Sequence, residues 1–268
     1  MIFYKLILKI LMVLVNERPQ ILVQYHNYVL SSVPKDAIQI RNLITSAVPL
    51  GVTLPNPLSP DLKVDLLPEM IIEPPLPIHY LNDTFCLTSR QLSFIYNSLF
   101  SGAEVDISSI NEFEISHYGR LHLAIYNFSM KAIIGKAFFD SEVMSQKIVP
   151  FYKKMLNFLE AESKYILLLT LSDQLRYPNK HTHYFSCLML SIFADTTDVY
   201  VKELITRVLL GRLIAHKPHP WGVMITFIEL VKNARFKFWS YDFTRSTAEI
   251  EKMFLAVAKS CMIEQGKR

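Results

Sequence analysis

Residues 175–190 read LRYPNKHTHYFSCLML, and residues 207–239 read RVLLGRLIAHKPHPWGVMITFIELVKNARFKFW. In each stretch a proline-containing turn, at residues 177–184 and 217–222, leads into a strongly apolar segment. Proline interrupts a preceding helix, and the apolar run after each turn has the pattern of a buried helix. This alternation predicts helices that stack on one another and disfavours a catalytic loop.

Helical patterns continue outward from these two turns in both directions. Apolar residues recur at three- and four-residue spacing. The expected helices span residues 3–16, 19–32, 36–47, 88–100, 117–135, 141–160, 162–175, 180–194, 197–215, 220–233 and 247–263. Asp36 is expected to cap the third helix, and Pro150 to kink or split the sixth. Because no alternating strand pattern is present, we predict an all-α fold of stacked antiparallel helix pairs, as in HEAT-like arrays.

A proline-rich segment separates the first helices from the rest. Residues 49–77 hold 8 of the 14 prolines of the chain, a density that blocks helix formation. The same segment carries many aliphatic residues, which a free linker lacks. We therefore predict an extended strap over residues 49–78 that packs on the helical body, with an interdomain linker as the alternative. In this interpretation residues 1–268 form a single domain.

The first 15 residues are apolar enough to resemble a signal peptide or a membrane span. They are too short for a span, which needs about 20 residues. Lys5 and Lys9 interrupt them, and no small-residue cleavage site follows. We predict a buried helix and no membrane association. The abrupt start leads us to expect that the chain is the end of a longer scaffold.

Composition favours a well-buried fold, since 51% of the residues are hydrophobic and 19% are charged.

The chain has three widely spaced cysteines, Cys86, Cys187 and Cys261. Their odd number and spacing suggest a reducing compartment and no disulfide or metal framework. Residues 1–134 carry 9 basic and 11 acidic side chains, and residues 135–268 carry 19 and 13. The basic half suits nucleic acid or an acidic partner, or it reflects solvated helix faces.

Motifs for catalysis are missing from the sequence. The seven glycines form neither a dinucleotide fingerprint nor a phosphate-binding loop, and neither G-x-S-x-G nor H-E-x-x-H occurs. We predict that the chain is not an enzyme and uses no cofactor or metal. His181, His183 and Cys187 are the one group with metal-ligand chemistry, but a fourth ligand is lacking. We expect both histidines to cap or pack at a helix start.

A second group of candidates combines cations with aromatic rings. The residues are Arg176, Lys180, Arg235 and Lys237, beside Tyr177, Phe236, Phe238 and Trp239. Basic groups interleaved with rings bind RNA through phosphates and base stacking. In the alternative interpretation the rings are core and the cations extend from it to solvent. Trp221 is expected to be buried with its indole donor paired, or to be a hot spot for a partner.

Long, ordered segments carry a resemblance to a known family. They are QYH at 24–26, VP at 33–34, IQIRNLI at 38–44, LPNPLSPDLKVD at 54–65, residues 179–186 and 218–239, EIEK at 249–252, and Phe254. These segments resemble the C-terminal domain of NOT-one, the large scaffold subunit of the Ccr–Not mRNA deadenylase complex. Residues 79–160 match that domain poorly. The end of the chain soon after Cys261 is similar to the natural C-terminus of the family.

The resemblance implies a helical, HEAT-like platform without catalytic activity. Such a platform docks the NOT-two subunit and the NOT-three or NOT-five subunit, and it supports mRNA deadenylation, mRNA decay and translational repression. We expect the cytoplasm as its location, with the nucleus as a second one. Short peptide motifs of mRNA regulators are further expected partners, and RNA is a weaker one.

Different residues are expected to serve protein binding and RNA binding. The expected partner-binding residues are Tyr177, His181, His219, Trp221, Phe236 and Trp239. The alternative function is a helical RNA-binding module that uses the basic C-terminal half, with Arg176, Lys180, Arg235 and Lys237 as its contacts.

Overall fold

The computed structural model describes residues 2–59, 62–75, 147–245 and 252, and all structural statements concern this part of the chain. Its α-helices are α1 (Ile2–Glu17), α2 (Pro19–Ser31), α3 (Ile38–Thr45), α7 (Val149–Phe158), α8 (Ala161–Ser172), α9 (Lys180–Asp195), α10 (Val199–Ile214) and α11 (Trp221–Lys232). Its 3-10 helices are η1 (Val64–Leu66), η2 (Pro68–Ile71), η6 (Ala234–Phe236), η7 (Phe238–Ser240) and η8 (Asp242–Thr244). Strands do not occur in the described ranges, and the all-α prediction is confirmed.

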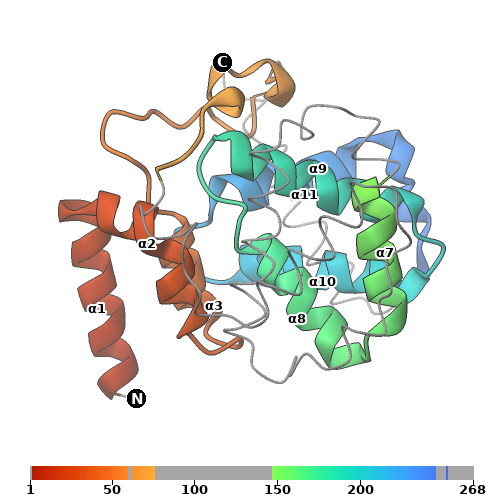
Figure 1. Cartoon of the computed structure of the whole chain (residues 1–268), viewed down its shortest axis with the longest axis horizontal. Helices are drawn as coiled ribbons and strands as arrows, with labels where there is room; N and C mark the ends of the chain where they lie inside the picture. The colour runs from red at the N-terminus through yellow and green to blue at the C-terminus, as the bar shows by residue number, and fades with distance from the viewer. Residues whose placement is uncertain (1, 60–61, 76–146, 246–251, 253–268) are drawn as a thin grey trace.

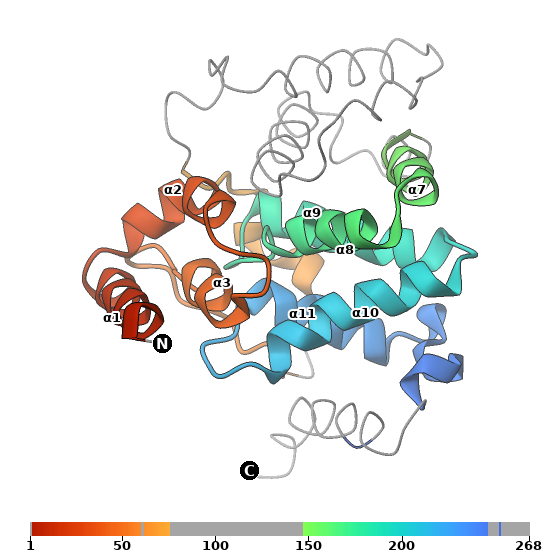
Figure 2. The same cartoon turned by 90° about the horizontal axis from the view of Figure 1, so that it is seen from below.

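The described helices form two adjacent groups (Figure 1, Figure 2). In the first group α1, α2 and α3 each contact the other two helices. In the second group α10 packs on α8 and α11, while α9 packs on α7, α8 and α11. Contacts between α3 and α10 join the two groups. The second group contains both of the turns from which the fold was predicted.

Aromatic rings fill the core of the second group where the 3-10 helices close over α9. The ring of Phe193 meets those of Phe236 and Phe238 at centroid distances of 6.1 and 6.4 Å. The Lys202 ammonium lies 4.7 Å from the Phe193 ring centroid and 5.3 Å from that of Tyr241. It also donates to the Phe193 carbonyl, so this buried charge is compensated by rings and a backbone acceptor.

A buried ionic network joins the two helix groups. Asp173, just after α8, accepts from Arg41 of α3 and from Arg212 of α10, each at 2.7 Å between Nη1 and a carboxylate oxygen. All three side chains have no exposed surface. Arg212 also donates to Asn42 Oδ1 at 2.8 Å and to Thr45 Oγ1 at 2.6 Å. Carbonyl and hydroxyl acceptors therefore add to the carboxylate in stabilising the two buried positive charges.

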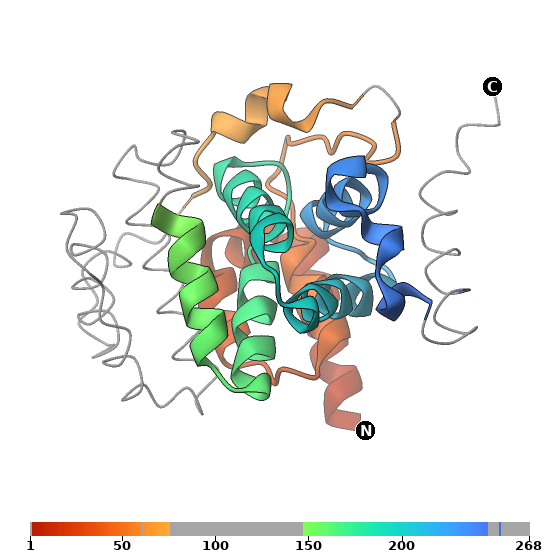
Figure 3. The same ribbon diagram turned by 90° about the vertical axis from the view of Figure 1, so that its right-hand side faces the viewer.

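The proline-rich segment is ordered on the body, as predicted for residues 49–59 and 62–75. Figure 3 shows η1 and η2 lying across α9 and α11. Met70 is buried against Trp221 and Ile225, and Leu62, Val64 and Leu67 pack around these three residues. Burial of aliphatic side chains holds the segment in place where proline prevents regular backbone hydrogen bonding. We call residues 49–75 the strap.

Two expectations about the N-terminal helices are wrong, whereas the one about Pro150 is not contradicted. Residue 37 is the N-cap of α3, and the side chain of Asp36 does not cap it. Pro150 lies in the first turn of α7, directly after a π-helical turn at residues 147–148, which agrees with the predicted kink or split, and residues 141–146 of that predicted helix lie outside the described residues. The N-terminal helix is not buried on all sides. Among residues 3–17 of α1 only Leu11 is buried, and Phe3 and Val13 are 74% and 59% exposed.

Helices α8 to α11 confirm four predicted helices, and each end lies within three residues of its predicted position. The predicted ranges were 162–175, 180–194, 197–215 and 220–233. Those at 88–100 and 117–135 lie outside the described residues, as do residues 76–78 of the predicted strap and all but Lys252 of the predicted helix 247–263.

Candidate functional site

The turn between α8 and α9 is held by an asparagine and a threonine. Asn179 Oδ1 accepts from the backbone N–H groups of His181 at 2.9 Å and of Thr182 at 3.0 Å. Its amide nitrogen donates to the Tyr177 carbonyl at 2.6 Å. Thr182 Oγ1 accepts from the Arg176 N–H at 3.1 Å. Asn179 therefore serves as the N-cap of α9, and the first turn of that helix is tied to the residues before it.

Gly222 lets α11 start in contact with the same turn. Its N–H donates to the Arg176 carbonyl at 2.6 Å. A Cβ at this position would lie 2.6 Å from Thr182 Cγ2 and 2.7 Å from the backbone carbon of Leu175. Both distances are too short for carbon atoms, so only glycine fits here. The Trp-Gly pair after the second turn is thus a requirement of close packing.

The strap is fastened across the N-terminal ends of α9 and α11. The Trp221 indole N–H donates to the Pro55 carbonyl at 2.8 Å. The Lys180 backbone N–H donates to the Ile72 carbonyl at 2.9 Å, and its ammonium lies 2.8 Å from Glu73 Oε1. Polar bonds at both ends of the strap hold it over the two helices.

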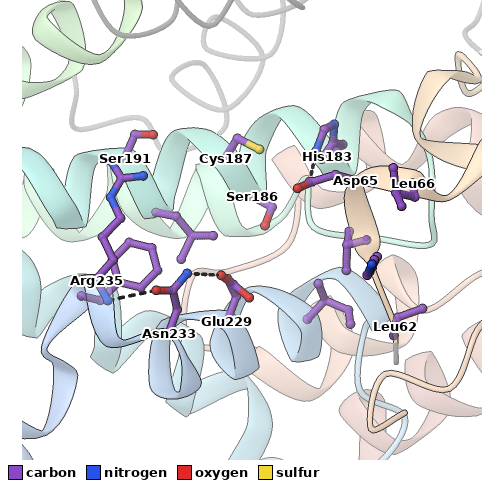
Figure 4. Close-up of a pocket in the computed structure, with 15 residues that line it drawn as sticks. Leu62, Asp65, Leu66, His183, Ser186, Cys187, Ser191, Glu229, Asn233 and Arg235 are labelled. Carbon is purple, nitrogen blue, oxygen red and sulfur yellow. Dashed lines mark hydrogen bonds and ion pairs between the residues drawn. The ribbon is translucent and has the colours of Figure 1, made fainter. Parts of the chain in front are cut away.

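A groove of about 580 Å³ opens between the strap, α9 and α11 (Figure 4). Its walls are residues 62–66 of the strap, residues 183–191 of α9, and residues 225–236 from α11 to η6. His183 Nε2 and Asp65 Oδ1, 3.0 Å apart, bridge α9 and the strap at one end. Ser191 and Arg235 lie at the other end, and Glu229 stands on the wall opposite α9. The groove is large enough for several side chains of a ligand.

Two titratable groups of α9 are uncharged near neutral pH. Burial raises the pKa of the Cys187 thiol to about 11, and nearby carboxylates raise it further. This groove-lining thiol is therefore not a reactive thiolate. Burial lowers the pKa of His181 well below its usual value, and the positive charges of Arg176 and Lys180 lower it further. His181 is a neutral residue of the interior.

The sequence of this chain matches the model of one known protein family. The family model described as "CCR4-Not complex component, Not1" matches residues 1–84 and 119–258. These ranges include most of the 268 residues, the strap and both turns. The chain belongs to the Not1 family. The resemblance to NOT-one that the sequence segments carry is confirmed.

Two curated members of the Not1 family are similar along nearly the whole chain. The "CCR4-NOT transcription complex subunit let-711" of Caenorhabditis elegans is 34% identical over 294 residues, which cover 100% of the chain. The "General negative regulator of transcription subunit 1" of Schizosaccharomyces pombe is 30% identical over 281 residues, which cover 94% of it. The chain spans only 11% and 13% of the lengths of these two relatives.

Solved structures of Not1 domains share the fold. The NOT1 superfamily homology domain from Chaetomium thermophilum superposes with a TM-score of 0.83 at 29% identity, over 95% of this chain and 52% of that one. A structure described as the Not1 C-terminal domain in complex with Not4 gives a TM-score of 0.78 at 23% identity, over 93% and 53%. The second likeness supports the fold alone.

The Not1 fold buries most of the expected partner-binding residues. Tyr177, His181, Trp221 and Phe236 are each at most 6% exposed, and His219 and Trp239 are half-buried. Direct partner contact by the first four is at odds with this burial. Trp221 instead has the structural role considered for it, a buried ring with a paired indole donor.

The four expected RNA contacts are not brought together. Arg176 is buried, and its Nη1 donates to the Val23 carbonyl at 2.9 Å, so it is not available at the surface. Lys180 is paired with Glu73 on the strap. Arg235 and Lys237 are exposed on η6 and just after it. The structure thus leaves two of the four cations at the surface, on one side of α11.

The metal-like group has other roles. His181 is buried in the first turn of α9, which agrees with the packing role predicted for it. His183 pairs with Asp65, and Cys187 lines the groove. Across the described ranges, no three His, Cys, Asp or Glu side chains are placed to hold a metal ion.

Several residues that build this region were not predicted from the sequence. Asn179 could have been identified as a cap, because it directly precedes the helix predicted from residue 180. The strap contacts of Asp65 and Glu73 could not, since each joins residues more than 100 positions apart. The groove follows from those contacts and was not predicted.

Apolar side chains are also exposed away from the groove. On α1 they follow a spacing of three, four and three residues, which places them on one side of the helix. They are Phe3, Leu6, Ile10 and Val13, each more than half exposed. Leu66, Ile71 and Ile72 are similarly exposed on the strap.

Within the described residues, no helix is both long and apolar enough to cross a membrane.

Proposed function

We propose that this chain is a non-catalytic scaffold domain of the Ccr–Not complex, which docks the NOT-two subunit and the NOT-three or NOT-five subunit. Membership of the Not1 family carries the proposal, because one relative is described as a subunit of the CCR4-NOT complex. Through these subunits the chain supports mRNA deadenylation, mRNA decay and translational repression. We place it in the cytoplasm, with the nucleus as a second location.

The surface supports a docking role. Side chains as large as Phe3, Leu6 and Leu66 are more than half exposed, and apolar surface of this kind is typical of protein-binding faces. The rigid body beneath them favours binding without large rearrangement, since its helices are joined by a buried ionic network.

A third subunit is a candidate partner of the same platform. A Not1 C-terminal domain of the same fold has been solved in complex with Not4. We propose that a Not4-type subunit binds this chain as well.

Size-exclusion chromatography with light scattering tests the proposal. The chain is mixed at about 5 µM with the C-terminal regions of NOT-two and NOT-three or NOT-five subunits of the same organism. Co-elution as one species of summed mass is expected, because an obligate interface buries at least about 2,000 Å². Separate elution of all components at this concentration would reject the docking role.

Two activity measurements complete the test. The chain alone, with Mg²⁺, is expected to leave a poly(A) substrate at full length, and shortening that follows the chain through purification would make it an enzyme. Direct RNA binding is the alternative function, and Arg235 and Lys237 are its remaining surface cations. Tight, salt-dependent binding of a single-stranded oligonucleotide at about 50 mM salt would favour it.

A further inference from the structure

One lysine of the strap has sequence neighbours that no other lysine of the chain has. Residues 62–65 read Leu-Lys-Val-Asp, so an aliphatic residue directly precedes Lys63 and a carboxylate follows two positions later. Enzymes that conjugate a small ubiquitin-like modifier (SUMO) bind this four-residue pattern directly. The aliphatic side chain packs on an apolar patch of the enzyme, and the carboxylate pairs with a basic group near the catalytic cysteine. The sequence thus makes Lys63 a candidate acceptor, provided that an enzyme can reach it.

Lys63 and Asp65 both lie on the surface of the strap. Lys63 is exposed, its backbone is extended with φ −99° and ψ 96°, and it has no ion pair with another described residue. The side chain of Asp65 is 85% exposed. Leu62 and Val64, which alternate with these two residues, are half-buried. The nucleophile and the carboxylate are therefore accessible in the native structure, and only the aliphatic side chain is packed against the body.

Residues 62–66 can separate from the body without detaching the strap. The strap is fixed on either side of them, at Pro55 by the indole of α11 and at Ile72 by the first residue of α9. Among the described residues, no backbone hydrogen bond joins this stretch to α9 or α11. The N–H groups of Leu66 and Leu67 donate within η1 and its end, at 3.1 Å each. A single 3-10 turn is marginal on its own, so it can extend and expose the aliphatic residue to an enzyme.

We propose that Lys63 is an acceptor site for a SUMO-type modifier, and that the conjugating enzyme recognises it through Leu62 and Asp65. The lysine nitrogen attacks the carbonyl carbon of the thioester that joins the C-terminus of the modifier to the enzyme cysteine. An amide bond forms and the carbon–sulfur bond breaks. The nitrogen gives up two protons, one to the departing sulfur and one to solvent. ATP is consumed earlier, when an activating enzyme makes the thioester.

Asp65 has one bond in the folded chain that recognition must replace. Its carboxylate lies 3.0 Å from His183 Nε2, and this bond holds the strap to α9. His183→Ala breaks the bond and frees the carboxylate for the enzyme. Asp65→Asn weakens the same bond but removes the charge that the enzyme needs. Two changes at one contact are therefore expected to act differently on conjugation, which separates recognition from a structural effect.

Conjugation of the intact chain tests the proposal. The chain is incubated with SUMO, its activating and conjugating enzymes and ATP, without a ligase. Mass spectrometry of the branched peptide identifies the acceptor, and gels give initial rates. Lys63→Arg keeps the positive charge but removes the nucleophile. Lys232→Arg is the matched control, because Lys232 is also exposed and follows a valine but has alanine two positions later. Thermal melts check that every variant folds.

Conjugation is expected at Lys63, to be lost on Lys63→Arg and to change less than about twofold on Lys232→Arg. Asp65→Asn is expected to slow it about tenfold or more, because a charged contact in the transition state is lost. Asp65→Glu is expected to stay within about threefold of the wild type, and His183→Ala to be as fast or faster. No conjugate at Lys63, equal conjugation at other lysines, an unchanged rate for Asp65→Asn, or an equal loss on His183→Ala would each overturn the proposal.

Hydrogen exchange tests the access route. The N–H groups of Leu66 and Leu67 are expected to exchange at least about tenfold faster than those of Leu188 and Met189 at the centre of α9, because η1 opens alone. Equal rates would show that this stretch opens only when the whole domain unfolds, and an acceptor site on the native chain would then be refuted.

The modification site does not depend on the scaffold proposal. Conjugation is measured on the chain alone, so its outcome is the same whether or not the NOT subunits co-elute with the chain.

Discussion

Arg212 of α10 donates to Asp173 at 2.7 Å, and neither side chain has any exposed surface. Arg41 of α3 binds the second oxygen of the same carboxylate, also at 2.7 Å. One anion thus joins helices that are 132 and 39 residues away from it in sequence. This geometry ties the two helix groups together through a carboxylate that both arginines share.

Asp173→Ala is expected to lower the free energy of unfolding by about 3–5 kcal/mol, because two buried guanidinium groups lose the carboxylate that both of them bind. Urea unfolding followed by circular dichroism measures the change. Glu203→Ala is the control, since it breaks an exposed pair with Arg207 at 2.6 Å and is expected to cost about 0.5 kcal/mol or less. Equal effects of the two substitutions would show that the buried network is not stabilising.

Two glycines in helices are expected to respond in opposite directions. Gly222→Ala places a Cβ 2.6 Å from Thr182 Cγ2 and 2.7 Å from backbone, which α11 can relieve only by moving. We expect a loss of at least about 2 kcal/mol, as for other overpacked sites. Gly211→Ala meets nothing within 4 Å inside α10 and is expected to add about 0.5–1 kcal/mol. A stabilising Gly222→Ala, read from the same unfolding curves, would contradict the close approach.

The strap is expected to depend on Trp221. Trp221→Phe keeps an apolar ring beside Met70 but removes the hydrogen bond to the Pro55 carbonyl at 2.8 Å. We expect a loss of about 1 kcal/mol in global stability and faster proteolysis within residues 49–75. Trp221→Ala should cost about 3–5 kcal/mol. Wild-type cleavage rates in the strap of Trp221→Phe would show that this bond does not hold it.

The buried histidine predicts a pH dependence. In the folded chain the pKa of His181 lies well below its usual value, chiefly because of burial. In the unfolded chain it titrates near pH 6.5. Below about pH 6.5 the unfolded state therefore binds a proton that the folded state does not, and stability falls toward the folded pKa by up to about 1.4 kcal/mol per pH unit. Above that pH this contribution is constant.

His181→Gln is the matched variant, because glutamine is polar but does not titrate. Between pH 7.5 and pH 5.5 the wild type is expected to lose about 1 kcal/mol more than the variant, as measured by urea midpoints at each pH. Parallel losses in the two proteins would mean that His181 is protonated in the folded state.

Local patterns were sufficient to predict most of the described helices. Apolar segments bounded by turns placed the ends of α8 to α11 within three residues, and α8 is buried on all sides from Ile166 to Ser172. The pattern misled at α1, where apolar residues on both sides of the helix suggested full burial although one side is exposed. Periodicity reports how apolar a face is, and it does not report whether a neighbour covers it.

Long-range polar contacts were beyond the reach of local patterns. Arg41, Asp173 and Arg212 read as isolated charges in sequence, and only the fold shows that they meet. The candidate site could not be predicted from local patterns for the same reason. Trp221 and His181 were noticed as unusual residues of two turns, but the groove depends on contacts between α9 and the strap that have no local signature.

Titration calorimetry of a preassembled NOT-two and NOT-three pair into the chain measures directly whether this member of the Not1 family is a docking platform. We predict one-to-one binding with a dissociation constant below about 1 µM and a negative heat-capacity change, which marks burial of apolar surface. No saturable heat at several temperatures, with both samples folded, would contradict it.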